Sequence, residues 1–156
     1  MYNILILLIK LFLTNSPQNK IKIELQLMYI FNKKNRILRK YFQRRLYYVY
    51  HCDISEVSKI DVSVEFIHPI AVVIGSKVVV EKNCYIYQNV TIGSNFNDNK
   101  MPYIKQGTKI SAGAKLIGNI TIGQNCIVGA NAVITKSVPD NTVVYGFNNM
   151  KENKYV

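Results

Sequence analysis

The chain has 156 residues, which is one domain plus an appendage, and 49% of them are hydrophobic, which suffices for a core. Its formal net charge is +11, and residues 1–52 hold ten of the basic residues against Glu24 alone. The three cysteines fit no metal-ligand spacing, which argues against a cysteine metal site; we expect Cys84 and Cys126 to be core residues, in a reducing compartment. The basic block indicates an anionic partner, either a membrane surface, a phosphorylated cofactor or nucleic acid, unless it is simply a solvated helix face.

The first segment, residues 1–13, is strongly apolar, but it is too short to span a bilayer and Lys10 interrupts it. It has neither a charged segment before it nor a small-residue cleavage site after it, so we do not expect a signal peptide. Ser16 followed by Pro17 is typical of a capped helix start. Residues 17–33 mix the alternation of a strand with the spacing of a helix, and we favour a helix there.

A further helix is predicted over residues 35–50 from one apolar stripe, made of Leu38, Tyr41, Phe42, Leu46 and Val49. Basic residues four apart lie on its other face, at Arg36, Lys40 and Arg44. Aromatic residues among arginines indicate a membrane-surface helix or RNA contact, although such a stripe more commonly packs against its own domain.

From Ile74 to Pro139 the sequence repeats every six residues. The first position of each six is aliphatic: Ile74, Val80, Ile86, Ile92, then Ile104, Ile110, Leu116, Ile122, Val128 and Ile134. The fifth position is small or β-branched, and Cys84 and Cys126 occupy it. This period fits neither a helix face nor an alternating strand, and it indicates a solenoid. Three sixes close a triangular coil, so residues three sixes apart are expected to stack.

Two irregularities mark where the solenoid is expected to carry function. The six-residue beat continues upstream at Ile54, Ile60 and Phe66, so we expect the repeat to begin at Asp53. The segment Phe66–Val73 has eight residues instead of six, and this insertion carries His68. A polar, Asn-rich loop interrupts the repeat over residues 94–103, and loops on a rigid scaffold commonly hold binding residues.

The sixes resemble those of the hexapeptide-repeat acyltransferases, whose coils form a left-handed parallel β-helix. The handedness rests on this resemblance, since parallel crossovers are usually right-handed. The resemblance implies a mainly β fold: a basic helical segment over residues 1–52, a left-handed β-helix over 53–145 with a loop at 94–103, and a C-terminal tail over 146–156.

Within this family the chain resembles the serine acetyltransferases and the small polysaccharide-cluster O-acetyltransferases. His68 stands seven residues before Gly75, and Asp53 stands fifteen residues before His68, as in serine acetyltransferases. The segments V-T-I-G at 90–93 and S-A-G-A-K-L-I-G-N-I at 111–120 also match. The resemblance implies an acetyl-CoA-dependent O-acetyltransferase, in which His68 is the general base and Asp53 orients its imidazole.

The resemblance also implies that acetyl-CoA lies along the coils, in a groove between two subunits of a homotrimer. The matching positions are Gly93, Ala112, Ala130 and Lys136. The alanines would let an extended ligand approach the backbone, but they could equally be small corner residues without a ligand. Lys136 would meet a CoA phosphate, but it could equally be a solvated lysine. No metal is expected, because two histidines are too few for the three-histidine zinc site of hexapeptide-type carbonic anhydrases.

Three departures from the serine acetyltransferase pattern concern the acceptor. Met101 precedes Pro102 where those enzymes carry a second histidine, the helical segment is short, and Gly146-Phe147-Asn148-Asn149 replaces a G-V-P-A segment. They favour a sugar hydroxyl of a surface polysaccharide or its precursor. The alternatives are serine, on the way to cysteine, and a catalytically inactive scaffold. We expect a cytoplasmic protein, at the inner face of the membrane if residues 1–50 contact it, without a nucleic-acid partner.

Overall fold

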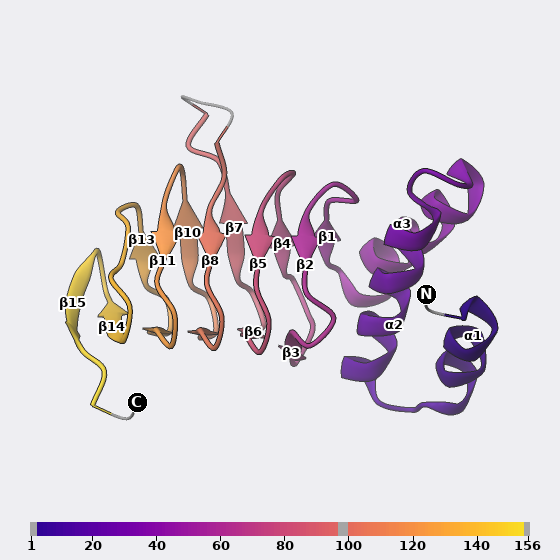
Figure 1. Ribbon diagram of the computed structural model, residues 1–156, viewed down its shortest axis with the longest axis horizontal. Helices are drawn as coiled ribbons and strands as arrows, with labels where there is room; N and C mark the ends of the chain where they lie inside the picture. The colour runs from indigo at the N-terminus through magenta and orange to yellow at the C-terminus, as the bar shows by residue number, and fades with distance from the viewer. Residues whose placement is uncertain (1–2, 97–99, 155–156) are drawn as a thin grey trace.

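The computed structural model describes residues 3–96 and 100–154. It is a parallel, triangular β solenoid with three helices at its N-terminal end (Figure 1). The expected left-handed β-helix of hexapeptide repeats is confirmed. The division into segments 1–52, 53–145 and 146–156 stays a prediction.

The helices are α1 (Ile4–Leu13), α2 (Pro17–Phe31) and α3 (Arg36–Tyr50). The predicted start of α2 is confirmed, because the Ser16 hydroxyl accepts a hydrogen bond from the Asn19 N–H at 3.4 Å and Pro17 is the first helical residue. Asn35 caps α3 in the same way, accepting from Leu38 N–H at 3.1 Å. No helix of the described residues is long and apolar enough to cross a membrane.

The predicted apolar stripe of α3 is only partly correct. Phe42, Leu46 and Tyr50 are buried, whereas Tyr41 and Val49 are each 53% exposed. The buried residues are four apart and face α2, so α3 meets the rest of the chain along one narrow line. A periodicity analysis cannot find the width of such a contact, because it depends on how many elements pack around the helix.

Each face of the prism is one sheet. Sheet A comprises β1 (Asp53–Ile54), β4 (Val73–Ile74), β7 (Thr91–Gly93), β10 (Lys115–Ile117) and β13 (Val133–Ile134). Sheet B comprises β2 (Lys59–Ile60), β5 (Val79–Val80), β8 (Tyr103–Ile104) and β11 (Thr121–Ile122). Sheet C comprises β3 (Glu65–Ile67), β6 (Tyr85–Tyr87), β9 (Lys109–Ile110), β12 (Ile127–Val128), β14 (Thr142–Tyr145) and β15 (Asn149–Glu152). All pairs are parallel except β14–β15, and this antiparallel hairpin lies at the far end of the prism from the helices (Figure 1).

The register shows how the two irregularities are absorbed. A regular coil brings Leu116 opposite Ile134, eighteen residues on, as the repeat predicts. The coil with the His68 insertion brings Ile54 opposite Ile74, twenty residues on, and the coil with the loop brings Ile92 opposite Leu116, twenty-four residues on. The extra residues are therefore accommodated at corners of the prism, and the aliphatic first positions keep their register. All five residues of these pairs are buried in the core.

The corners need backbone in the left-handed region, which Asn and Gly adopt most readily. Asn89, Asn125 and Asn131 all have φ between +52° and +57°. At Gly113, with φ +74°, an added Cβ would lie 2.0 Å from the Asn131 Oδ1 of the next coil, so only glycine fits that stacked corner.

Three edges of the prism follow from the strand order, and two of them position the candidate site. The C–A edge, between sheets C and A, carries residues 67–72, 87–90, 111–114 and 129–132. The A–B edge carries residues 55–58, 75–78, 93–96, 100–102, 117–120 and 135–138.

Candidate active site

His68 lies on the C–A edge and its side chain is exposed. Its φ of +52°, and that of +55° at Ala71, place two left-handed residues in the inserted corner. The Ile70 N–H donates to the His68 carbonyl at 2.7 Å, and Pro69 between them is buried. Because non-glycine residues adopt this backbone rarely, the corner is a specialised turn that presents the imidazole outward.

Asp53 begins β1, next to the same edge, and its side chain is also exposed. Its N–H donates to the Val72 carbonyl at 2.9 Å, which ties β1 to the end of the His68 corner. Among the described residues, no hydrogen bond or ion pair joins the Asp53 carboxylate to the His68 imidazole. The chain therefore brings the two residues to one edge without pairing them, and their catalytic roles stay a prediction.

Cys52 fixes the His68 corner from inside, a contact that the repeat pattern did not indicate. Its thiol is buried and lies 3.6 Å from the Pro69 carbonyl and 3.3 Å from the Tyr50 carbonyl, within hydrogen-bond reach of both. Burial raises the pKa of this thiol, so it is a neutral donor rather than a nucleophile. The signal in the sequence is its place two residues before Ile54, the same offset that Cys84 has from Ile86 and Cys126 has from Val128.

Gln88 is a second residue that the motifs did not single out. Ile67 is opposite Tyr87 in the β3–β6 register, so Gln88 stands on the coil next to His68. Its Oε1 is buried and has no hydrogen-bond partner among the described residues. A buried acceptor without a partner is costly, so this oxygen is an unsatisfied polar atom next to the His68 corner.

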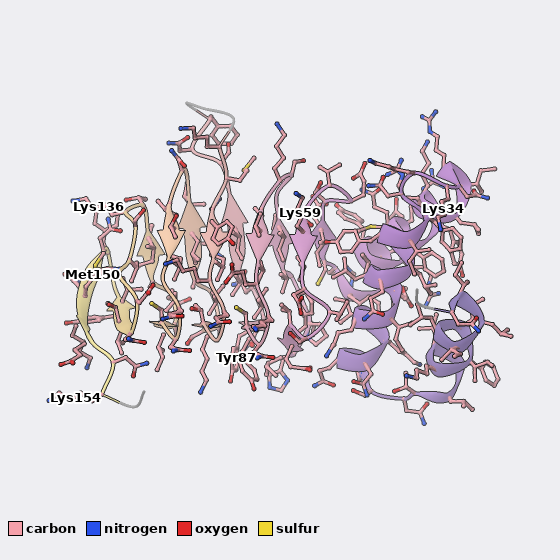
Figure 2. The ribbon with its side chains drawn as sticks, viewed as in Figure 1. Lys34, Lys59, Tyr87, Lys136, Met150 and Lys154 are labelled. Carbon is pink, nitrogen blue, oxygen red and sulfur yellow. The ribbon has the colours of Figure 1, made fainter. Side chains whose placement is uncertain are left out.

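The four predicted acetyl-CoA residues divide between two edges. Ala112 and Ala130 lie on the C–A edge with His68, on adjacent coils joined by the Asn131 N–H donating to the Ala112 carbonyl at 2.9 Å. Gly93 and Lys136 lie on the A–B edge, across sheet A. Figure 2 shows this separation, with Lys136 on the upper side of the prism and Tyr87, near His68, on the lower side. A single chain therefore does not bring these four residues into one groove.

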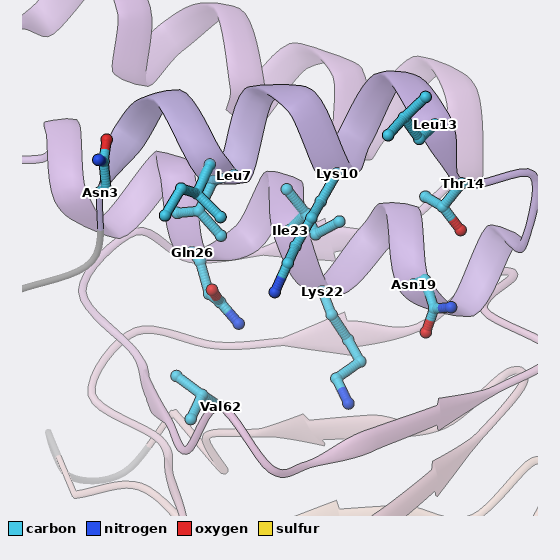
Figure 3. Close-up of a pocket in the computed structure, with 11 residues that line it drawn as sticks. Asn3, Leu7, Lys10, Leu13, Thr14, Asn19, Lys22, Ile23, Gln26 and Val62 are labelled. Carbon is cyan, nitrogen blue, oxygen red and sulfur yellow. The ribbon is translucent and has the colours of Figure 1, made fainter.

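The larger hollows of the described surface are elsewhere. One of about 840 Å³ lies between α1, α2 and Val62 (Figure 3), and one of about 810 Å³ runs from the end of α2 over β2 and β5. Neither His68 nor Asp53 lines them. A groove formed between two copies would not be a hollow of one chain.

Residues 101–136 match the family model of the bacterial transferase hexapeptide (six repeats). The chain is 36% identical over 121 residues to a serine acetyltransferase of Buchnera aphidicola subsp. Schizaphis graminum, covering 76% of this chain and 46% of that protein. The chain carries the hexapeptide repeat, is similar to the hexapeptide-repeat acyltransferases and is serine acetyltransferase-like. The Escherichia coli K12 serine acetyltransferase is 31% identical over 120 residues, covering 76% of this chain and 44% of the relative.

Solved structures agree with this likeness. A serine acetyltransferase in complex with CoA superposes with a TM-score of 0.77 at 27% identity, covering 86% of this hexapeptide-repeat chain and 56% of that chain. The crystal structure of serine acetyltransferase from Brucella abortus strain S19 gives a TM-score of 0.81 at 31% identity, with the same coverage. The chain spans less than half the length of these curated relatives.

Proposed function

We propose that this chain is an acetyl-CoA-dependent O-acetyltransferase with His68 as its general base. The observation that carries the proposal is the likeness to serine acetyltransferases, which extends over 76% of the chain. The exposed His68 in its specialised corner, with Asp53 beginning the adjacent strand, supplies the residues that the chemistry needs. The superposition on a serine acetyltransferase in complex with CoA supports acetyl-CoA as the donor.

In the proposed reaction, neutral His68 takes the proton of the acceptor hydroxyl while its oxygen attacks the thioester carbonyl. The new C–O bond forms an oxyanion, which a backbone N–H would stabilise. The C–S bond then breaks, and the proton passes from His68 to the departing CoA sulfur, so the acetyl ester and free CoA are the products. Asp53 would orient the imidazole and stabilise its charged form.

The site is proposed to be completed by a second copy of the chain, in a homotrimer. Support comes from the division of the candidate residues, because His68, Ala112 and Ala130 lie on the C–A edge while Gly93 and Lys136 lie on the A–B edge. If the C–A edge of one copy faces the A–B edge of the next, all of them line one groove. A closed ring of such unlike contacts has cyclic symmetry.

Serine is the acceptor that the relatives favour, since those matched are serine acetyltransferases. It was the alternative in the sequence analysis, where a sugar hydroxyl came first. The sugar remains the second candidate because of Met101, whose side chain packs against the core and whose Sδ lies 3.7 Å from where a Gly75 Cβ would be. An apolar thioether there cannot replace the polar contacts of a histidine with an amino acid.

The test is CoA release from acetyl-CoA by the full chain, with serine and with a panel of sugars offered separately. We expect release with one acceptor class and a loss of at least about a hundredfold in His68→Ala. An unchanged rate in His68→Ala would overturn the assignment of the base, and absence of turnover with every acceptor would favour an inactive scaffold. Met101→His gives the matched comparison, because it should raise turnover with serine only if serine is the acceptor.

A further inference from the structure

The outer face of α1 is an uncovered apolar stripe, which we call the α1 stripe and which consists of Leu5, Leu8, Ile9 and Phe12. These side chains are 63%, 44%, 49% and 86% exposed, respectively. Their spacing places them along one side of the helix, while buried Leu7 and half-buried Ile4 and Leu11 face α2. An apolar face of this continuity on a folded chain indicates an interaction surface.

The α1 stripe lies at one end of the molecule. Helices α2 and α3 cover the first coil, through β3 and β1 respectively, and α1 packs on α2 outside them (Figure 1). The stripe is therefore remote from the hairpin at the other end of the molecule, and α2 and α3 separate it from the first coil, which carries Asp53 and His68.

The same end carries most of the positive charge. Three of its basic residues form ion pairs, Lys22 with Glu65, Arg39 with Glu56 and Arg45 with Glu24. The others are outside these ion pairs: Lys10, Lys20, Lys33, Lys34, Arg36, Lys40 and Arg44. On the exposed side of α3, Lys40 and Arg44 alternate with Ile37, Tyr41 and Tyr48, which are 80%, 53% and 71% exposed.

We propose that the α1 stripe and the surrounding basic residues bind the surface of an anionic phospholipid bilayer, with α1 lying in the plane of the interface. An apolar helix face bordered by lysine, arginine and tyrosine is the pattern of interfacial helices. The ten residues of α1 are too few to span the hydrocarbon core, which agrees with a helix that lies on the surface.

Charge distinguishes a lipid surface from the other occupants. A second copy would bring two strongly basic ends together, and their repulsion opposes an apolar contact of this kind. A nucleic acid would use the basic residues but would leave the α1 stripe exposed to water. An anionic bilayer satisfies both features at once, because its headgroups attract the basic residues and its acyl boundary takes the apolar side chains.

Sedimentation of the full chain with vesicles, without acetyl-CoA, tests this proposal separately from catalysis. Vesicles of phosphatidylcholine alone are compared with vesicles that also contain phosphatidylglycerol. We expect binding mainly to the anionic vesicles, weakened about fivefold by Lys34→Ser, because each basic residue near the surface contributes roughly that factor. Lys154→Ser is the matched control, since Figure 2 places Lys154 at the opposite end of the molecule from Lys34.

The apolar contribution is tested with Phe12→Gln, which removes the ring without adding charge. We expect binding to fall at least about tenfold, while Phe147→Gln, an equivalent change at a residue 67% exposed at the other end, leaves it unchanged. Because Phe12 is 86% exposed, circular dichroism of the variant should match that of the unaltered chain. Equal binding by Phe12→Gln, or no preference for anionic vesicles, would overturn the proposal. A smaller oligomer for Phe12→Gln in lipid-free buffer would assign the stripe to a second copy instead.

Discussion

The ion pair between Glu24 and Arg45 joins α2 to α3, and we expect the loss of Arg45 to destabilise the protein more than the loss of Glu24. Glu24 is the sole acidic residue of residues 1–52, and it is fully buried between α2 and α3. Its Oε1 accepts hydrogen bonds from Arg45 Nε at 3.1 Å and Nη2 at 2.9 Å. The Tyr50 hydroxyl lies 3.4 Å from the same oxygen, while the buried Oε2 has no partner among the described residues. Arg45, in contrast, is 35% exposed at its side chain.

Removing Arg45 therefore leaves a carboxylate in the protein interior without its counter-ion, whereas removing Glu24 lets the arginine turn to water. Loss of one partner of a buried ion pair costs about 3–5 kcal/mol, and the partial exposure of Arg45 places Arg45→Met at the lower limit, about 3 kcal/mol. For a chain of this size that is a fall of about 6–12 °C in Tm. Glu24→Met should cost less than about 1 kcal/mol, and the double variant should stay within about 1 kcal/mol of the unaltered chain.

Urea unfolding followed by circular dichroism gives the free energies of all four proteins, and the cycle gives the coupling between the two side chains. The reasoning is refuted if Arg45→Met is as stable as the unaltered chain, or if Glu24→Met costs more than Arg45→Met. A double variant as unstable as Arg45→Met would also contradict it, because the cost would then come from lost packing of the arginine stem rather than from the buried charge.

Three further predictions concern the solenoid. Gly123→Ala should lower Tm strongly in a thermal melt, because its Cβ would lie 2.4 Å from the Asp140 backbone nitrogen, whereas Gly75→Ala, whose Cβ meets nothing closer than 3.5 Å, should have little effect. The Cys84 thiol is fully buried and burial raises its pKa to about 11, so iodoacetamide should label it only after unfolding; labelling of the folded chain would contradict its place in the core. The pKa of Glu81 is lowered chiefly by the Tyr103 hydroxyl, and that of Asp140 chiefly by the Gln124 N–H. Stabilisation by such carboxylates is present above the unfolded pKa and is lost as pH falls through the folded one, so Tm should decline below about pH 4. In thermal melts of the double variant Glu81→Gln/Asp140→Asn, Tm should decline less between neutral and acidic pH than it does in the unaltered chain.

The regular part of the solenoid could be predicted because its signal is local and repeated. Each aliphatic first position is buried by the coils above and below it, so the same requirement recurs every six residues. The start of α2 could also be predicted, because a capping residue and a proline at the first helical position act on their own helix end. The register across Ile54, Ile92 and Leu116 followed once the extra residues were assigned to corners.

Other features depended on contacts between distant segments. The width of the buried face of α3 was set by α2, so Tyr41 and Val49 proved exposed. Cys52 beneath Pro69 and the unpartnered Gln88 oxygen became visible only when the coils were stacked. The division of the predicted acetyl-CoA residues between two edges has the same origin, since distance along the chain does not specify which edge of a triangle a residue occupies.

The repeat alone was thus sufficient to predict a triangular solenoid and the corner that holds His68, because burial of one aliphatic residue per six acts within each coil, whereas its handedness came from the family resemblance. The neighbours of the His68 imidazole depend on how the coils pack against one another and against the helices. Hydrogen bonds, ion pairs and exposure at the site arise between residues that the linear order keeps apart, and they exist only once the prism has closed.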